Sequence, residues 1–455
     1  MRLPSLILVG ASLLATLPVT AQINDGRPDP AIVVPESLDL PYALGFALDN
    51  NFTIRQAKER IRQQEGIVLE VRSSQIPAVD ATAGYARNDD EIGTNGRDHN
   101  WSVNITARQV LYAGGGVRAS VAAQQLTLDA AVLSLRAVIN DALLQVRTRF
   151  YTVLVNRERI KVQEQNIELL QRQLQDVKNR YEAGTVSNFE VLRAEVALAN
   201  AQPALITARN DHRLAIEELR QVLGFVNPGT ENVAKVPSFI GTLEFTPVSF
   251  DLRTALDSAR EHRPDLQRLT KLASAAEQSV TARRAAYQPT ISAYGAYDWR
   301  MNSTGSSSLS NARDGWTVGL SSSWDIFDGR ATAGRVSQAR SFLEQAKLSL
   351  AEAQLSVDVD VRRAISTYQQ ATELAEASKK VVTQAEEAVR LANARFSAGT
   401  ATQLDVLTSQ VDLTTARLNQ LQAYYSYNVA VANARRAMGL GDELTPAGVL
   451  TWPAK

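Results

Sequence analysis

Hydrophobic and polar positions follow two different periods along this chain, and each period predicts one kind of element. Apolar residues recur every three or four positions through residues 40–73, 117–180 and 187–223, which places them on one face of an α-helix. In residues 79–87 and 101–109, apolar or aromatic residues instead alternate with polar or small ones, as in a β-strand with one apolar face. The first half of the chain therefore predicts the order helix, strand, strand, helix, helix.

The second half of the chain repeats this order. Strands are predicted at residues 291–300 and 316–325, a long helix at 333–395, and a returning helix that ends near Met438. The repeat is most visible where each long helix turns back. The sequence YEAGTVSNFEVL that begins at Tyr181 returns 215 positions later as FSAGTATQLDVL. Two copies of one unit of roughly 200 residues indicate a structural duplication rather than a short-period solenoid.

The start of the chain predicts export. Arg2, an apolar run over residues 6–17 and small residues before Gln22 are typical of a cleaved signal peptide, and the run is too short to span a bilayer. The chain has no Cys that could carry a lipid anchor. We therefore expect five segments: a signal peptide (1–21), a first repeat (22–224), a linker (225–250), a second repeat (251–439) and a short C-terminal tail (440–455).

The lengths of the predicted helices suggest how each repeat is built. Residues 117–180 have coiled-coil spacing and no internal Pro or Gly, so they would form a helix about 95 Å long. The returning helix at 187–223 covers only about half of that length. The helix at 40–73 supplies nearly the other half, so we expect these two to stack end to end beside the long one.

The predicted strands suit a membrane. Segments of about ten residues are long enough for tilted transmembrane β-strands, although the signal in each strand is weak. A small soluble sheet with a buried aromatic face therefore stays open as an alternative. The strands contain four of the five Trp residues, whose rings would lie at the membrane interfaces: Trp101, Trp299, Trp316 and Trp324.

Four strands are too few to close a membrane barrel, since the smallest known barrels have eight. An open sheet edge in lipid would leave backbone groups without hydrogen bonds. The chain is therefore expected to oligomerise. A cyclic trimer would supply twelve strands to one shared barrel, and the long helices would form a tube below it.

Composition argues against several other functions. Lys and Arg number 48, as do Asp and Glu, so no basic surplus points to a nucleic acid partner. The chain has no Cys, no HExxH motif and no Gly-rich phosphate loop, and we expect its three His, at 99, 212 and 262, to be solvated surface residues. These features predict no catalytic site, no metal and no cofactor.

The whole mature chain resembles the TolC-type outer membrane efflux family. The resemblance rests on the duplicated unit, the strand pairs, the two turn sequences, and the entries into the long helices, which read VLYAGG from Val110 and WDIFDG from Trp324. It implies a mixed α and β fold. In this fold, a TolC-like trimeric channel-tunnel has four transmembrane strands per chain in a shared 12-stranded barrel and a long periplasmic coiled-coil barrel.

The resemblance also implies a function and partners. A homotrimer would lie in the outer membrane of a Gram-negative-type cell, in contact with its lipid, and would export drugs, small molecules or proteins. It would work with a periplasmic adaptor (membrane fusion) protein and an inner-membrane pump, in tripartite efflux or type I secretion, and would not be an enzyme. The alternative is a periplasmic coiled-coil adaptor without a channel, which would carry a lipoyl-like domain in place of the strand pairs.

The resemblance further implies residues at the periplasmic mouth. Asp405 matches an acid of the ring that closes this aperture. Three other positions depart from the family pattern: Thr408 replaces a second acid, Ala401 an Arg, and Phe396 a Tyr of the closing network. A role for Asp405 as a helix-start residue favoured by the helix dipole stays equally open. The hairpin tips expected to dock the adaptor are Gly184, Thr185, Gly399 and Thr400.

Overall fold

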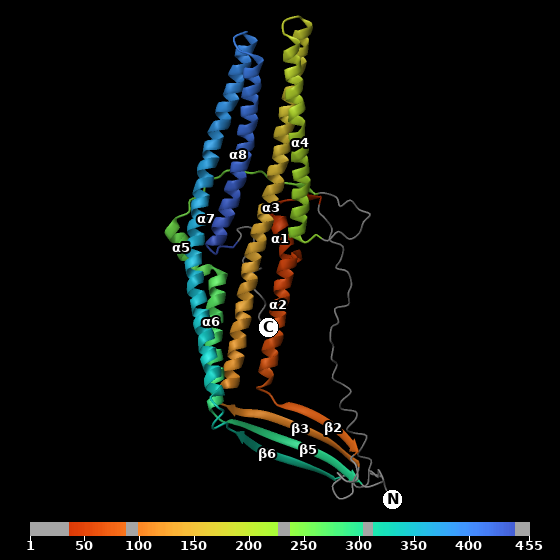
Figure 1. The fold of residues 1–455 in the computed structure, drawn as a ribbon, viewed down its shortest axis with the longest axis vertical. Coiled ribbons are helices and arrows are strands. Elements are labelled where there is room, and N and C mark those ends of the chain that lie inside the picture. Colours follow the sequence, from red (N-terminus) through yellow and green to blue (C-terminus); the bar gives the residue numbers. More distant parts are fainter. Residues whose placement is uncertain (1–35, 88–98, 226–236, 304–312, 442–455) are drawn as a thin grey trace.

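The computed structural model describes residues 36–87, 99–225, 237–303 and 313–441 and shows a long helical body with a β-sheet at one end (Figure 1). The predicted signal peptide, parts of the linker and of the polar loops between strands, and most of the C-terminal tail lie outside the described residues. Two long helical hairpins extend from the middle of the molecule to the end opposite the sheet.

The two repeats contain the same elements in the same order. The first consists of α1 (Leu40–Asn50), α2 (Phe52–Ser73), β2 (Ala78–Arg87), β3 (His99–Ala113), α3 (Gly116–Glu182) and α4 (Asn188–Leu223). The second consists of α5 (Leu252–His262), α6 (Pro264–Arg284), the short 3₁₀ helix η1 (Ala285–Tyr287), β5 (Thr290–Ser303), β6 (Arg313–Ser323), α7 (Ala331–Ser397) and α8 (Gln403–Ala437). Two short strands, β1 (Ser37–Leu38) and β4 (Ser238–Phe239), pair in parallel.

The four long strands form one antiparallel sheet in the order β2-β3-β5-β6. The two repeats meet at its centre, where Val103 of β3 lies opposite Trp299 of β5. A register shift between Val110 and Tyr112 lets β3 continue past its predicted end. The prediction that Trp324 lies within a strand was wrong, because β6 ends at Ser323.

Within each repeat a long helix pairs with the returning helix through small buried side chains. In α4 these are alanines spaced seven residues apart, Ala194, Ala201, Ala208 and Ala215. A strict seven-residue repeat keeps one face of a helix against its partner and winds the pair into a left-handed supercoil. Alanine at these positions lets the two helices approach closely along the hairpin.

The predicted helix at 40–73 is in fact two helices, and Asn51 separates them. Its backbone is extended, and its side-chain oxygen accepts hydrogen bonds from the N–H groups of Thr53 (2.9 Å) and Ile54 (3.2 Å), which caps α2. The amide nitrogen of the same side chain donates to the carbonyl oxygen of Val222 at the end of α4, at 2.6 Å. The buried Asn51 thus joins α4 to α2, so the two stack end to end as expected, while α1 runs beside α3.

The second repeat makes the equivalent joint with different residues. Pro264 starts α6 and favours the extended backbone of Arg263, which separates α5 from α6. The Arg263 side chain is largely buried and forms ion pairs with Asp265 (2.6 Å) and Asp360 (3.5 Å). The hydroxyl of Ser258 donates to the carbonyl oxygen of Met438 at 3.1 Å, which connects α8 to this joint.

The described part of the linker runs across the helices and is held by side chains from both repeats. Arg157 of α3 donates to the carbonyl oxygens of Phe239 (2.6 Å) and Gly241 (2.7 Å). Tyr427 of α8 donates to the carbonyl oxygen of Thr246 at 2.5 Å. Burial, followed by the neighbouring Tyr368, raises the pKa of Tyr427 to about 12, so its hydroxyl stays protonated. The linker therefore connects the two repeats through bonds to both.

The helix joint in the first repeat leaves no room for a side chain at Gly224. A Cβ atom there would lie 2.3 Å from the carbonyl oxygen of Asn50. Gly184 has a similar φ (72° against 80°), yet no described atom lies within 4 Å of its Cβ position. We predict that Gly224→Ala lowers the apparent melting temperature by several degrees more than Gly184→Ala, since both lose about 1–2 kcal/mol to the left-handed backbone and only Gly224→Ala adds a clash. Equal decreases in melting temperature for the two variants, measured by thermal denaturation, would show that the joint can relax.

Candidate functional site

The sheet has one apolar and one polar face. Apolar side chains on the first face are well exposed, as for Trp316 (74%) and Val318 (73%). The register aligns its members across the four strands: Val79, Tyr85, Val103, Ile105, Tyr297, Trp299, Trp316, Val318 and Leu320. A broad apolar surface of this kind in contact with water is unfavourable, so it marks a contact with lipid or with another protein.

The opposite face carries a hydrogen-bonded polar cluster. Asp298 accepts hydrogen bonds from the side chains of Asn104 (2.6 Å) and Arg300 (3.0 Å). Thr106 donates in turn to Asn104 at 2.6 Å. The two faces therefore differ as the two sides of a membrane barrel wall would. The apolar face carries charged residues at the end remote from the helices, at Arg87 and Asp314.

Three of the four Trp residues lie in the sheet, and Trp324 lies just beyond the end of β6. Trp101, Trp299 and Trp316 lie toward the end remote from the helices, where Trp101 and Trp299 make an edge-to-face contact at 4.9 Å. Trp324 lies beside the helical body, and its indole N–H donates to the carbonyl oxygen of Tyr287 at 3.2 Å. Trp316 and Trp324 are eight residues apart, so at about 3.3 Å per residue they are separated by roughly 26 Å along the strand direction.

The two hairpin tips have the same backbone geometry. At the first tip, Thr185 donates its N–H to the carbonyl oxygen of Arg180 and Gly184 donates to that of Tyr181, both at 2.9 Å. These two bonds form a Schellman motif, which requires the left-handed backbone that Gly184 supplies. Gly399 and Thr400 repeat the pattern at the second tip. All four tip residues are exposed.

Asp405 caps the helix that leaves the second tip. Its carboxylate accepts hydrogen bonds from the N–H and the hydroxyl of Thr402, each at 2.8 Å, and the Thr402 hydroxyl accepts from the Asp405 N–H at 3.3 Å. This is a complete capping box. The backbone bond from Thr402, and then its hydroxyl, lower the pKa of Asp405. The side chain is nevertheless exposed, so capping leaves it accessible to solvent.

Phe396 connects the two hairpins at their tips. The guanidinium of Arg180, in the last turn of α3, lies over its ring at 4.9 Å from the centroid. Arg180 is itself held by Asp176 at 2.9 Å. A Tyr hydroxyl is therefore unnecessary for contact between the hairpins in this chain, because the ring binds a cation instead. Of the remaining aperture residues, Ala401 is half-buried and Thr408 is exposed.

The described residues include no group of three or more His, Asp or Glu side chains that could hold a metal ion. His262 is exposed, as expected. The prediction was wrong for His212, which is half-buried against α3, where burial lowers its pKa. Within the described parts of the chain, no helix is both long and apolar enough to cross a bilayer.

Comparison with known proteins identifies the family. A profile described as Outer membrane efflux protein matches residues 43–225 and 255–440, which together make up most of the chain. The chain belongs to this family. Protein CyaE of Bordetella pertussis is 27% identical over 405 residues, covering 86% of this chain and 84% of CyaE. Outer membrane protein TolC of Escherichia coli is 25% identical over 396 residues, covering 83% of this chain and 77% of TolC.

Solved structures share the fold. The CmeC outer membrane channel of Campylobacter jejuni superposes with a TM-score of 0.77 at 16% identity, covering 90% of this chain and 87% of CmeC. The open-state MtrE outer membrane channel of Neisseria gonorrhoeae superposes with a TM-score of 0.72 at 19% identity, covering 88% of this chain and 89% of MtrE. These matches confirm the predicted fold. The family profile and the curated relatives favour an export channel over a coiled-coil adaptor.

The contact between Arg180 and Phe396 predicts a measurable role in holding the hairpins together. The chain has no Cys, so spin labels can be placed at Glu182 and Ser397 without background. We expect Phe396→Leu to lengthen and broaden the distance distribution between the labels, because an aliphatic side chain removes about 0.5–1 kcal/mol of cation–π attraction. Phe396→Tyr keeps a ring and should leave the distribution unchanged.

A matched control exists within one helix. Arg193 lies over the ring of Phe189 at 4.8 Å, and both residues belong to α4. Phe189→Leu removes a contact of the same kind without joining two hairpins, so the label distance should stay as in the unmodified protein. If Phe396→Leu has no larger effect than Phe189→Leu, the contact with Arg180 does not hold the tips together.

Proposed function

We propose that three copies of the chain form one export channel through the outer membrane. The observation that carries this proposal is the four-stranded sheet with one apolar face and two open edges, β2 and β6. Three such sheets can pair edge to edge into a closed barrel of twelve strands, which removes every open edge from the lipid. The apolar face then contacts lipid and the cluster around Asp298 faces the lumen.

The helices continue the channel on the other side of the membrane. Three copies of the α3–α4 and α7–α8 hairpins, with the shorter helices stacked on them, would form a hollow helical barrel. The two levels of Trp residues support this placement, since their separation of roughly 26 Å along the strand matches an apolar band of about 25 Å. The end of the barrel beside the helices then faces the periplasm, in agreement with export by a signal peptide at residues 1–21.

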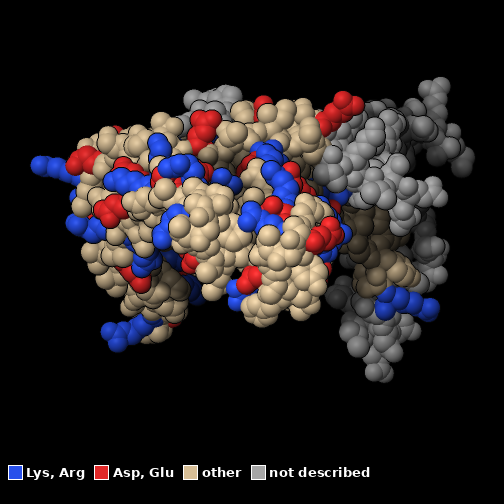
Figure 2. Space-filling view, turned by 90° about the horizontal axis from the view of Figure 1, so that it is seen from above, with Lys and Arg blue, Asp and Glu red and all other residues tan. Residues whose placement is uncertain are grey.

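The hairpin tips are the surface proposed to meet an adaptor. Gly184, Thr185, Gly399 and Thr400 are exposed at the end remote from the membrane. Viewed toward this end, Lys and Arg side chains are interspersed with Asp and Glu side chains (Figure 2). A mixed surface suits a partner with paired charges of both signs rather than a strongly charged polymer. The adaptor would connect the channel to an inner-membrane pump, and the chain itself would transport rather than catalyse.

The entrance is proposed to close at Asp405. A threefold axis would bring three copies of this exposed carboxylate together at the narrowest point of the mouth. Mutual repulsion raises the pKa of such carboxylates, in the opposite direction to the hydrogen bonds from Thr402. Thr408 adds no second ring of charge, and Ala401 adds no ion pair. We therefore expect a single, weakly selective ring whose closure depends in part on the Arg180–Phe396 contact.

The proposed barrel predicts that an added charge destabilises one position of a strand and is tolerated at the next. Val318 lies on the apolar face and the adjacent Thr317 on the polar face. Val318→Arg should make folding into a bilayer less favourable by about 2–4 kcal/mol if the position lies near the midplane. Thr317→Arg should change this free energy little. Refolding into liposomes of the two variants measures the difference. Equal sensitivity at both positions would contradict a barrel wall with lipid on the Val318 side.

The proposed ring predicts a change in ion selectivity. Asp405→Asn should shift the reversal potential toward weaker cation preference and relieve block by divalent cations in planar bilayer recordings. The preference of the unmodified channel for cations should fall as the pH drops, because the three carboxylates become protonated. Glu352→Gln removes the same charge from an exposed site on α7 far from the tip and should have no effect. An unaltered reversal potential in Asp405→Asn would leave Asp405 as a helix cap only.

A further inference from the structure

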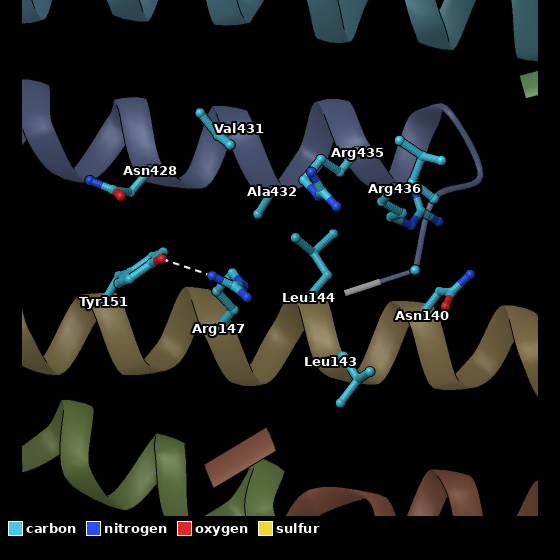
Figure 3. Close-up of a pocket in the computed structure, with 12 residues that line it drawn as sticks. Asn140, Leu143, Leu144, Arg147, Tyr151, Asn428, Val431, Ala432, Arg435 and Arg436 are labelled. Atoms are coloured by element: carbon cyan, nitrogen blue, oxygen red, sulfur yellow. Dashed lines mark hydrogen bonds between the residues drawn. The ribbon is translucent and has the colours of Figure 1, made fainter. Parts of the chain in front are cut away.

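The two repeats are in contact at two levels within one chain. In the middle of the molecule α3 lies beside α8, and Leu144 and Ala432 point into a small pocket between the two helices (Figure 3). At the sheet, β3 of the first repeat pairs with β5 of the second. The contact at the sheet has a counterpart between copies, because the proposed barrel pairs β6, the second strand of its repeat, with β2, the first strand of the other repeat.

Inside the chain, the segment that leads from β3 into α3 packs closely on the segment before β5. The Tyr112 hydroxyl donates a hydrogen bond to the side-chain oxygen of Gln288. Gly114 lies so near to Ala285 that a Cβ atom on the glycine would be 2.7 Å from the Ala285 carbonyl oxygen. These contacts fix the two repeats to each other where the sheet meets the helices.

The duplication assigns a counterpart to each residue of the first segment. The segment from β6 into α7 lies 215 positions after the one from β3 into α3, so Phe327 corresponds to Tyr112 and Gly329 to Gly114. The backbone agrees with this assignment, since φ is 58° at Gly114 and 67° at Gly329. Phe327 is therefore presented after β6 as Tyr112 is presented after β3.

The residue that Tyr112 contacts also has a counterpart. Ile76 and Gln288 each lie two residues before a strand of the sheet, β2 in one repeat and β5 in the other. The polar pair inside the chain thus corresponds to an apolar pair, Phe327 and Ile76. Both members differ in the same sense, because Phe lacks the hydroxyl group and Ile lacks the amide group that form the internal hydrogen bond.

The apolar pair is well exposed in a single chain. Phe327 is 84% exposed and Ile76 is 63% exposed. Phe327 follows the edge strand β6 and Ile76 precedes the other edge strand β2, so β3 and β5 separate them within one copy. In contrast to Gly114, no described atom lies within 4 Å of the Cβ position at Gly329. The place that the second repeat fills beside Gly114 is therefore open beside Gly329.

We propose that Phe327 of one copy packs on Ile76 of the next copy, as Tyr112 packs on Gln288 within the chain. The proposal rests on the β2–β6 pairing of the proposed trimer and adds a specific contact at the level where the sheet meets the helices. An apolar pair suits assembly, because association removes from water two side chains that a separate copy leaves exposed.

Cross-linking with a bis-maleimide tests this contact, because the chain has no Cys of its own. In the full-length protein in membranes, Ile76→Cys with Phe327→Cys should give covalent dimers and trimers. Tyr112→Cys with Gln288→Cys is the matched internal pair and should react within one chain, without a gain in mass. Gln63 is exposed on α2, about 15 Å before the end of that helix. Gln63→Cys with Phe327→Cys should therefore give several-fold fewer cross-linked species.

Exchanging the side chains of the two pairs tests the chemistry of the contact. Ile76→Gln should lower by several degrees the temperature at which the assembled protein dissociates in detergent. Adding Phe327→Tyr should recover most of this loss, because the pair between copies then has the hydrogen-bonding groups of Tyr112 and Gln288. No recovery, together with few cross-links between positions 76 and 327, would assign both side chains to lipid and overturn the proposal.

Failure of this contact can be told apart from failure of the trimer. If cysteines in β2 and β6 cross-link neighbouring copies but those at positions 76 and 327 do not, the trimer stands and the Phe327–Ile76 contact is wrong. If neither set cross-links neighbouring copies, both proposals are wrong.

Discussion

The rest of this structure depends on one constraint: the backbone hydrogen-bonding groups along the outer edges of β2 and β6 need partners. In the described sheet, each of these strands pairs on one side only. Water can satisfy an open edge in a soluble protein, but hydrocarbon cannot. The apolar face is well exposed, as at Val318 and Trp316 of the edge strand β6, which favours a place for the sheet in lipid. In the proposed trimer, the copies complete one another: the open edges pair, and the long helices of three chains enclose the passage.

The two repeats have equivalent helix joints that are built from different residues. Each repeat must join a returning helix to a shorter helix, so that together they match one helix of 67 residues. In the first repeat, one neutral side chain, Asn51, caps both helices. In the second, Arg263 forms ion pairs with α6 and α7 next to the proline that starts α6, and Ser258 bonds to the end of α8. The joints place Gly224 and Gly439 against neighbouring backbone, which explains why each returning helix ends in glycine.

The sequence predicted the features that depend on periodicity and missed those that depend on contacts between distant residues. The duplication, the four strands and the long helices follow from spacing within short windows. The break at Asn51 was missed because the apolar pattern continues across it. The Arg180–Phe396 contact joins residues 216 positions apart in the sequence, which no short window can relate. The departures at Phe396, Ala401 and Thr408 indicated that the entrance differs from the family pattern, without indicating what replaces it.

The central claim is that β2 of one chain pairs with β6 of the next. Engineered cysteines test it most directly, because the natural chain has none. One cysteine is placed in β2, at Ala81, Ala83 or Tyr85, and the other in β6, at Trp316, Val318 or Leu320, to sample the unknown register on the apolar face. Oxidation of membrane-embedded protein should yield covalent dimers and trimers, and no species above the trimer, for the pair in register. Only single chains in every combination, or an open ladder of higher species, would contradict a closed barrel of three subunits.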